Sequence, residues 1–259
     1  MKQWLLLFQK EWLEMTRNFK VVWIPLVFIL IGMMQPITSY YLPQIIEKAG
    51  NLPEGAVFEI PLPSSGVVLA QTLGQYSQVG VLILVLAFMG IVSSERNSGV
   101  AGMILVKPVS YTSYITAKWL SASLLAFLSF LIGMLSAWYY TELLIGDVVI
   151  SALIKGILIY GLWLTFLLTL TVLLSSLLKS SGVVAFLTLL TAILLSASTS
   201  LLSKWMQWSP ARLSTHANAL FISGTPDTNF ILSLFVTIAL IIVFLLVSVQ
   251  MFQRKELGE

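Results

Sequence analysis

Six long stretches of this chain contain no charged residue. They cover residues 21–46, 60–94, 119–141, 156–178, 180–203 and 228–253. About 20 apolar residues in a helix cross the hydrocarbon core of a bilayer. Because no water reaches the backbone there, every N–H and C=O group has to be paired internally, which favours helices. The sequence therefore predicts an all-α polytopic membrane protein with six transmembrane helices and both termini on one side.

Within these stretches, we place the helices near residues 21–41, 77–94, 118–140, 152–175, 182–203 and 230–251. Two longer connections follow from this placement. Residues 42–76, which contain several prolines, are expected to form an external loop. Residues 204–229 contain two tryptophans and the only histidine, His216, and are expected to form an external interfacial or re-entrant segment.

The composition leaves no room for a large soluble domain. Of the 259 residues, 58% are hydrophobic and 10% are charged, whereas soluble proteins average about 25% charged residues. We therefore expect residues 1–259 to form a single transmembrane domain. The net charge of +3 is explained by basic residues that flank the spans and meet anionic headgroups, so membrane lipid is an expected partner and nucleic acid is not.

Lysine and arginine are distributed unequally over the two sides. One side carries only Lys48, Lys155, Lys204 and Arg212, and the side with the termini carries the other ten of the 14 basic residues. Basic residues near spans accumulate on the cytoplasmic side of a membrane. The bias predicts a multi-pass protein with both termini and the 95–117 connection in the cytoplasm.

The first twenty residues predict a separate helix. Trp4, Phe8 and Trp12 recur at helical spacing, while the charged residues Lys2, Lys10, Glu14 and Arg17 interrupt the remainder of the segment. This pattern is typical of an interfacial helix that lies along the cytoplasmic surface. The alternative is a charged lead-in to the first span.

Several kinds of chemistry are missing from the sequence. There is no phosphate-binding loop of the Gly-x-x-x-x-Gly-Lys-Ser/Thr type, there is no cysteine, and a single histidine cannot build a multi-histidine metal site. No charged residue is expected near the bilayer midplane, which disfavours an ion-coupled carrier. We therefore expect no catalytic residues, no metal site and no cofactor bound by this chain.

The polar connection between spans two and three is the best clue to function. Glu95 and Arg96 leave the second span together, Gly99 permits a turn, and residues 100–106 are suited to a short helix. A helix is expected to stop at Lys107 because the residue before Pro108 avoids the helical region. Residues 95–117 therefore predict a cytoplasmic loop that serves as a handle for a soluble partner.

Four sequence features, in this order along the chain, resemble the membrane subunits of ABC-2 type ABC transporters. They are Lys10-Glu11-Trp12-x-Glu14-x-x-Arg17, Glu95-Arg96-x-x-Gly99, Lys107-Pro108-Val109-Ser110 followed by Tyr114 and Lys118, and Phe252-x-Arg254-Lys255-Glu256. The resemblance covers the chain from end to end and is closest to half-size, six-span bacterial members. It implies the bacterial cytoplasmic membrane as the location.

The resemblance also implies a mechanism. Residues 96–106 would be the coupling helix that docks on a separate cytoplasmic ATPase subunit, and Glu95 with Arg96 would transmit its movement to span two. The first twenty residues would also lie against the ATPase, with the 175–181 loop as a second contact. ATP and Mg²⁺ would be bound by that partner, and the permease would pair with itself or with a similar chain.

The expected substrate is an amphiphile, such as a drug, an antimicrobial peptide or a lipid-linked molecule, and its binding residues are not identified by the sequence. Serines and threonines inside the spans serve helix packing or line a substrate path. The alternative function is a non-transport membrane assembly or immunity protein, in which the 95–117 loop recruits a different cytosolic partner.

Overall fold

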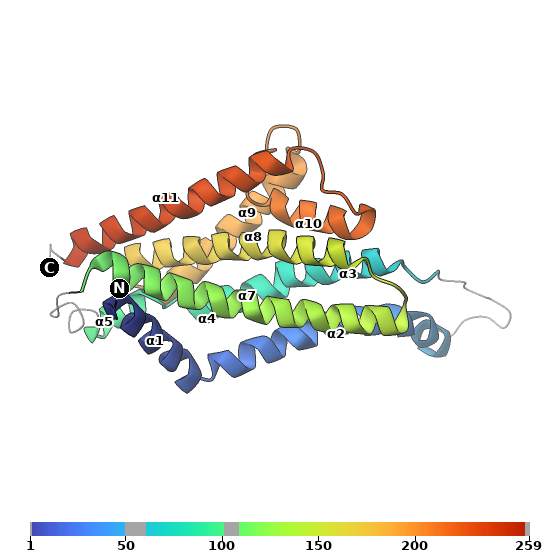
Figure 1. Ribbon diagram of the computed structural model, residues 1–259, viewed down its shortest axis with the longest axis horizontal. Helices are drawn as coiled ribbons and strands as arrows, with labels where there is room; N and C mark the ends of the chain where they lie inside the picture. Colours follow the sequence, from blue (N-terminus) through green and yellow to red (C-terminus); the bar gives the residue numbers. More distant parts are fainter. Residues whose placement is uncertain (1, 50–60, 101–108, 257–259) are drawn as a thin grey trace.

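The protein is a bundle of long helices (Figure 1). The computed structural model describes residues 2–49, 61–100 and 109–256. The described elements are α1 (Lys2–Arg17), α2 (Lys20–Ala49), α3 (Ser65–Gln75), the π-helical turn η1 (Tyr76–Gly80), α4 (Val81–Phe88), α5 (Ser93–Asn97), α7 (Tyr111–Leu144), α8 (Ile150–Leu177), α9 (Ser181–Leu201), α10 (Arg212–Ser223) and α11 (Phe230–Glu256). The described residues contain no strand.

Six helical segments among the described residues are long and apolar enough to span a membrane. They are Lys20–Ile46, Ser65–Asn97, Tyr111–Leu144, Ile150–Leu177, Ser181–Leu201 and Phe230–Arg254. The predicted class, an all-α polytopic membrane protein with six spans, is confirmed. The separate N-terminal helix also forms, as α1.

Helix replaces loop at the edges of two predicted connections. In the predicted 42–76 loop, α2 continues to Ala49 and α3 already begins at Ser65. Three prolines, Pro25, Pro36 and Pro43, lie inside α2, because neighbouring helices in a membrane protein can satisfy the backbone groups that proline frees. In the predicted 95–117 loop, α7 begins at Tyr111, where the side chain of Ser110 caps it by accepting a hydrogen bond from the N–H of Ser113.

The chain ends meet at one end of the bundle. The start of α1, the start of α7, the end of α11 and the short helix α5 lie together, and α3 lies toward the other end (Figure 1). We call the first of these the α5 end. The connection between α8 and α9 also reaches it, because the Asn97 side chain donates to the carbonyl of Lys179 over 2.7 Å.

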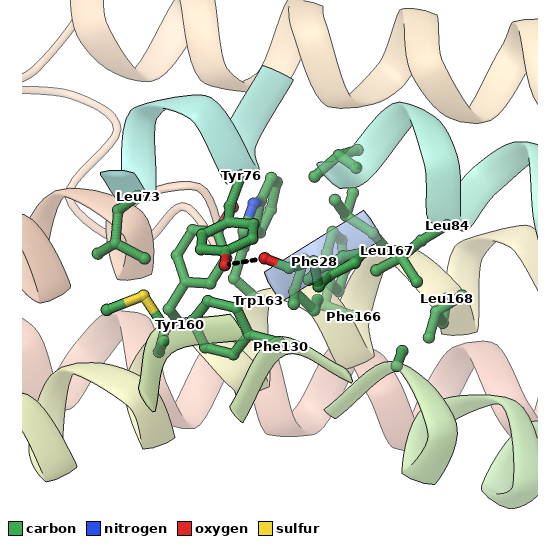
Figure 2. Close-up of a cluster of buried hydrophobic side chains, with 14 of the residues drawn as sticks. Phe28, Leu73, Tyr76, Leu84, Phe130, Tyr160, Trp163, Phe166, Leu167 and Leu168 are labelled. Atoms are coloured by element: carbon green, nitrogen blue, oxygen red, sulfur yellow. Dashed lines mark hydrogen bonds between the residues drawn. The ribbon is translucent and has the colours of Figure 1, made fainter. Parts of the chain in front are cut away.

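An aromatic cluster holds the middle of the bundle together (Figure 2). The ring of Tyr76, in the π-helical turn, stacks on Phe28 of α2 at 5.2 Å and meets Phe130 of α7 edge-on at 5.3 Å. Its hydroxyl donates to the carbonyl of Phe28 over 2.7 Å. Phe130 in turn contacts Tyr160 of α8 at 4.9 Å. Tyr76 of span two therefore joins α2 and α7 directly, and Phe130 extends the cluster to α8.

The backbones of α2 and α7 approach closely at two glycines. A Cβ atom added at Gly32 would overlap the carbonyl oxygen of Gly133, and one added at Gly133 would come within 2.7 Å of the carbonyl oxygen of Phe28. Small residues at such crossings allow membrane helices to pack tightly. The close approach of α2 and α7 therefore depends on the missing side chains.

We expect Gly133→Ala to destabilise the protein by about 1–3 kcal/mol, because the added methyl group overpacks the crossing of α2 and α7. Thermal unfolding in mild detergent measures the effect. The matched control is Gly74→Ala in α3, where a Cβ atom meets nothing within 4 Å. Equal melting temperatures for the two variants would contradict this account of the crossing.

The 204–229 segment contains a buried helix. The helix α10 packs against α8 and α3, and Phe221 fits between two glycines, since a Cβ atom at Gly66 would overlap its carbonyl oxygen and one at Gly156 its ring. The helix ends at Ser223 and is capped by Gly224, whose φ of +75° suits glycine. The membrane depth of α10 remains a prediction.

His216 of α10 is fully buried, and its ring packs edge-on against Phe230 at 5.4 Å. In the described part of the chain neither ring nitrogen has a hydrogen-bond partner. Burial lowers the pKa of His216 below its ordinary value; Arg212 acts in the same direction and Asp227 opposes it. The fold therefore favours the neutral form of this histidine.

Protonation of His216 should weaken the fold. Since its pKa is lower in the folded than in the unfolded chain, its contribution is complete above the ordinary value of 6.5 and is lost as the pH falls below that value. We expect the melting temperature in detergent to fall between pH 7.5 and pH 5, and to fall less in His216→Phe. An identical pH dependence in wild type and variant would contradict this prediction.

Candidate functional site

The aromatic residues predicted on the first helix form a stacked row. The rings of Trp4 and Phe8 lie 5.6 Å apart, and those of Phe8 and Trp12 lie 6.2 Å apart. Trp4 is fixed to α7, because its indole N–H donates to the hydroxyl of Thr116 over 3.0 Å. Arg17 is exposed at the last position of α1.

Leucines, rather than the aromatic row, form the most exposed apolar surface of α1. The exposed fractions of Leu5, Leu6 and Leu13 are 53%, 63% and 51%, whereas the three aromatic side chains are half-buried. Sequence reasoning missed these leucines because it followed only the large aromatic residues. The interfacial role of α1 stays a prediction.

The opposite face of α1 contributes to a buried ion-pair network. The ammonium group of Lys118 in α7 lies 2.9 Å from a carboxylate oxygen of Glu11 in α1 and 2.9 Å from one of Glu95 in α5. The side chains are 2%, 9% and 9% exposed, respectively. A buried charge is tolerated only when it is paired. One lysine therefore holds three helices together.

Lys10 and Tyr114 complete the network. Lys10 pairs with Glu95, with Glu11 at 2.9 Å and with Glu14 at 3.2 Å, and the hydroxyl of Tyr114 donates to Glu95 over 2.5 Å. Burial by itself would lower the pKa of Lys10, but the charge of Glu11 and the hydrogen bonds to Glu95 and Glu11 raise it above its ordinary value. Lys10 is therefore charged at neutral pH.

Three carboxylates of this network have the spacing of a cation site. Ligand oxygens of Glu11, Glu14 and Glu95 lie within 4.8 Å of one another. The ammonium groups of Lys10 and Lys118 already lie among them and neutralise most of their charge. The geometry supports an ion-pair network that fixes helices rather than a metal centre.

Glu95 and Arg96 stand on a short helix that is separate from the rest of span two. The helix is interrupted at residues 89–92, between α4 and α5. The N–H groups of Val92 and Ser93 donate to the hydroxyl of Ser175 in α8 over 3.1 and 3.0 Å. Such a side-chain acceptor satisfies backbone groups that a helix break frees.

The remaining predicted residues of this loop are placed as follows. Arg96 is half-buried in α5. Gly99 follows α5 with a φ of +75°, which is the turn that its position predicted. Lys107, Pro108 and the predicted helix over residues 100–106 lie outside the described residues, apart from Val100, which is exposed.

The C-terminal end of α11 also meets this site. Phe252 is fully buried, stacks on Tyr114 at 5.2 Å and meets Tyr111 edge-on at 6.1 Å. Tyr114 thus contacts Phe252 with its ring and Glu95 with its hydroxyl. All four sequence features that carry the family resemblance contribute residues to the α5 end.

The fold and this site define a six-span, all-α membrane protein with a charged network at the bundle end where its termini meet. Residues 28–257 match the family described as proteins of unknown function, DUF2705, and the chain belongs to that family. It is also 34% identical, over 99% of both chains, to an uncharacterized transmembrane protein of Bacillus subtilis (strain 168), YxlG.

We expect Lys118→Met to destabilise the protein by about 3–5 kcal/mol, because it leaves Glu11 and Glu95 buried without their central partner. Thermal unfolding in detergent measures the loss. The matched control is Lys155→Met, since Lys155 is exposed on α8. An equally stable Lys118→Met protein would show that the network does not hold the three helices.

Proposed function

We propose that this protein is the membrane-spanning permease subunit of an ATP-binding cassette exporter. It resides in the bacterial cytoplasmic membrane with both termini and the α5 end in the cytoplasm. The basic residues of its connections support this orientation, because ten of the 14 lie on the side of the termini. A separate cytoplasmic ATPase binds ATP and Mg²⁺.

The buried network at the α5 end is the observation that carries the proposal. A transporter driven by a separate ATPase needs a rigid link from its cytoplasmic surface into its spans. Lys118 supplies such a link between α1, the end of span two and the start of span three, through contacts of 2.9 Å to Glu11 and Glu95. A push on α1 or α5 is therefore passed to α7.

The connection between α8 and α9 extends the same surface. Asn97 of α5 donates to the carbonyl of Lys179, and Ser175 holds the start of α5. These contacts support the 175–181 connection as a second docking contact for the ATPase.

ATP-driven closure of the ATPase subunits would move the 95–117 segment and shift the spans between two conformations. Export needs two permease chains, either two copies of this one or this chain with a similar one. The chain itself performs no bond chemistry, and it extrudes an amphiphile such as a drug, an antimicrobial peptide or a lipid-linked molecule.

Co-purification tests the proposal. We expect a phosphate-binding-loop ATPase to accompany the wild-type protein from its native membrane in mild detergent, identified by mass spectrometry. The amount of ATPase that co-purifies with the double variant Arg96→Ala, Lys107→Ala should be at least about tenfold lower, because both positions lie on the docking segment. The matched control is the double variant Lys155→Ala, Lys204→Ala. It removes the same amount of positive charge, but from two exposed residues on the side of the protein opposite the termini.

The amount of each double variant in the membrane and its melting temperature show whether the variant still folds, which separates a loss of docking from a loss of folding. Loss of the ATPase from a variant that still folds, but not from the control, supports the permease. Absence of any ATPase from the intact wild-type protein would overturn the proposal and favour the assembly or immunity protein that recruits another partner.

A further inference from the structure

Two cavities meet beside α9 and α10. The larger, of about 490 Å³, lies between span two, α8 and α9. The smaller, of about 270 Å³, lies between the end of α9 and α10. Ser196 and Ser214 line both, so the cavities are adjoining chambers. The larger cavity alone is within the size range of small-ligand sites, roughly 300–1,000 Å³, and the smaller one extends it.

The two chambers have different chemistry. Most of the larger wall is apolar and is made by Val81, Leu82, Trp163, Leu167, Leu189 and Ile193. The smaller chamber is lined by serine and threonine hydroxyls together with the charged pair Arg212 and Asp227. An apolar chamber that opens onto a polar one fits a ligand with an apolar chain and a polar head.

Arg212 gives the polar chamber a buried cation. The residue is 8% exposed; its guanidinium donates to Asp227 over 3.1 Å and to the carbonyl of Ser203 over 2.7 Å. A guanidinium has five N–H donors, more than these two bonds use. The side chain of Asp227 is 44% exposed, so water weakens its hold on the cation. An anionic head can therefore compete with Asp227 for Arg212.

A departure from regular helix geometry lies at the other side of the larger chamber. Ser77 and Gln78, in the π-helical turn, both line it, and both are exposed. Short π-helical turns within helices occur frequently at functional sites. The hydroxyl of Ser77 pairs with that of Tyr160 in α8 at 3.0 Å. Gln78 is the polar side chain in the middle of the span for which a chamber that takes an amphiphile provides a reason.

We propose that these chambers bind an amphiphile with a single alkyl chain and an anionic head, a phosphate or a carboxylate. The chain occupies the larger chamber and the head binds Arg212 and the neighbouring hydroxyls. This site deepens the proposed function by naming the substrate class. The transport of the ligand rests on the proposed function, but its binding does not, because binding requires no ATPase.

Binding of radiolabelled hexadecyl phosphate to the purified chain in phosphatidylcholine nanodiscs tests the site. Arg212→Gln should weaken binding at least about tenfold by removing the charge. Ala192→Trp should also abolish it, because Ala192 lines the larger chamber. Ala197→Trp is the matched control, since Ala197 is exposed on the same helix and lines neither chamber.

Asp227→Asn gives a result that misfolding cannot imitate. It releases Arg212 from its competing carboxylate, so binding should become several-fold tighter.

Equal competition by the neutral-headed dodecyl maltoside, or by inorganic phosphate alone, would overturn the proposal, as would full binding by Ala192→Trp. Binding that follows these variants while no ATPase co-purifies would retain the site and reject the permease, so the two proposals fail separately.

Discussion

A single buried ammonium group determines how one end of this bundle is assembled. Inside a membrane, apolar side chains gain little by exchanging lipid for each other, so apolar packing alone gives weak preference for one arrangement of helices. Lys118, which is fully buried, adds a directional requirement, since its charge has to meet carboxylates. Only the arrangement that brings Glu11 and Glu95 to it satisfies this requirement, and the positions of α1 and α5 follow.

The spans were predictable because lipid imposes a simple rule on composition, and each charge-free stretch of the sequence coincides with one span of the bundle. The boundaries were less predictable where a charge or a proline is compensated from elsewhere in the chain. Lys118 was taken as the start of a span, yet it lies two turns inside α7, since α7 begins at Tyr111. Its partners, Glu11 and Glu95, lie 107 and 23 positions away along the chain, and local sequence does not reveal such distant pairing.

The candidate site was predicted in pieces. Glu95 was singled out as a residue of a cytoplasmic handle, and Lys10, Tyr114 and Phe252 were noted only as parts of separate motifs. Their meeting at the α5 end depends on the crossing of α1, α7 and α11, which is tertiary packing. The break at residues 89–92 is similar, because the hydroxyl that accepts its free N–H groups belongs to Ser175 of another span.

Span two connects the charged network with the amphiphile chambers. Glu95 and Ser77 are 18 residues apart along it, which is roughly 27 Å at the rise of an α-helix. Between them, the break at residues 89–92 separates α5 from α4, so α5 is not a continuous extension of α4. Beyond Ser77, the ring of Tyr76 is packed against α2 and α7. A displacement of α5 would therefore act on α7 directly through Lys118, and on the chambers through the shared packing around Tyr76. These contacts form a continuous physical route from the α5 end to the centre of the bundle.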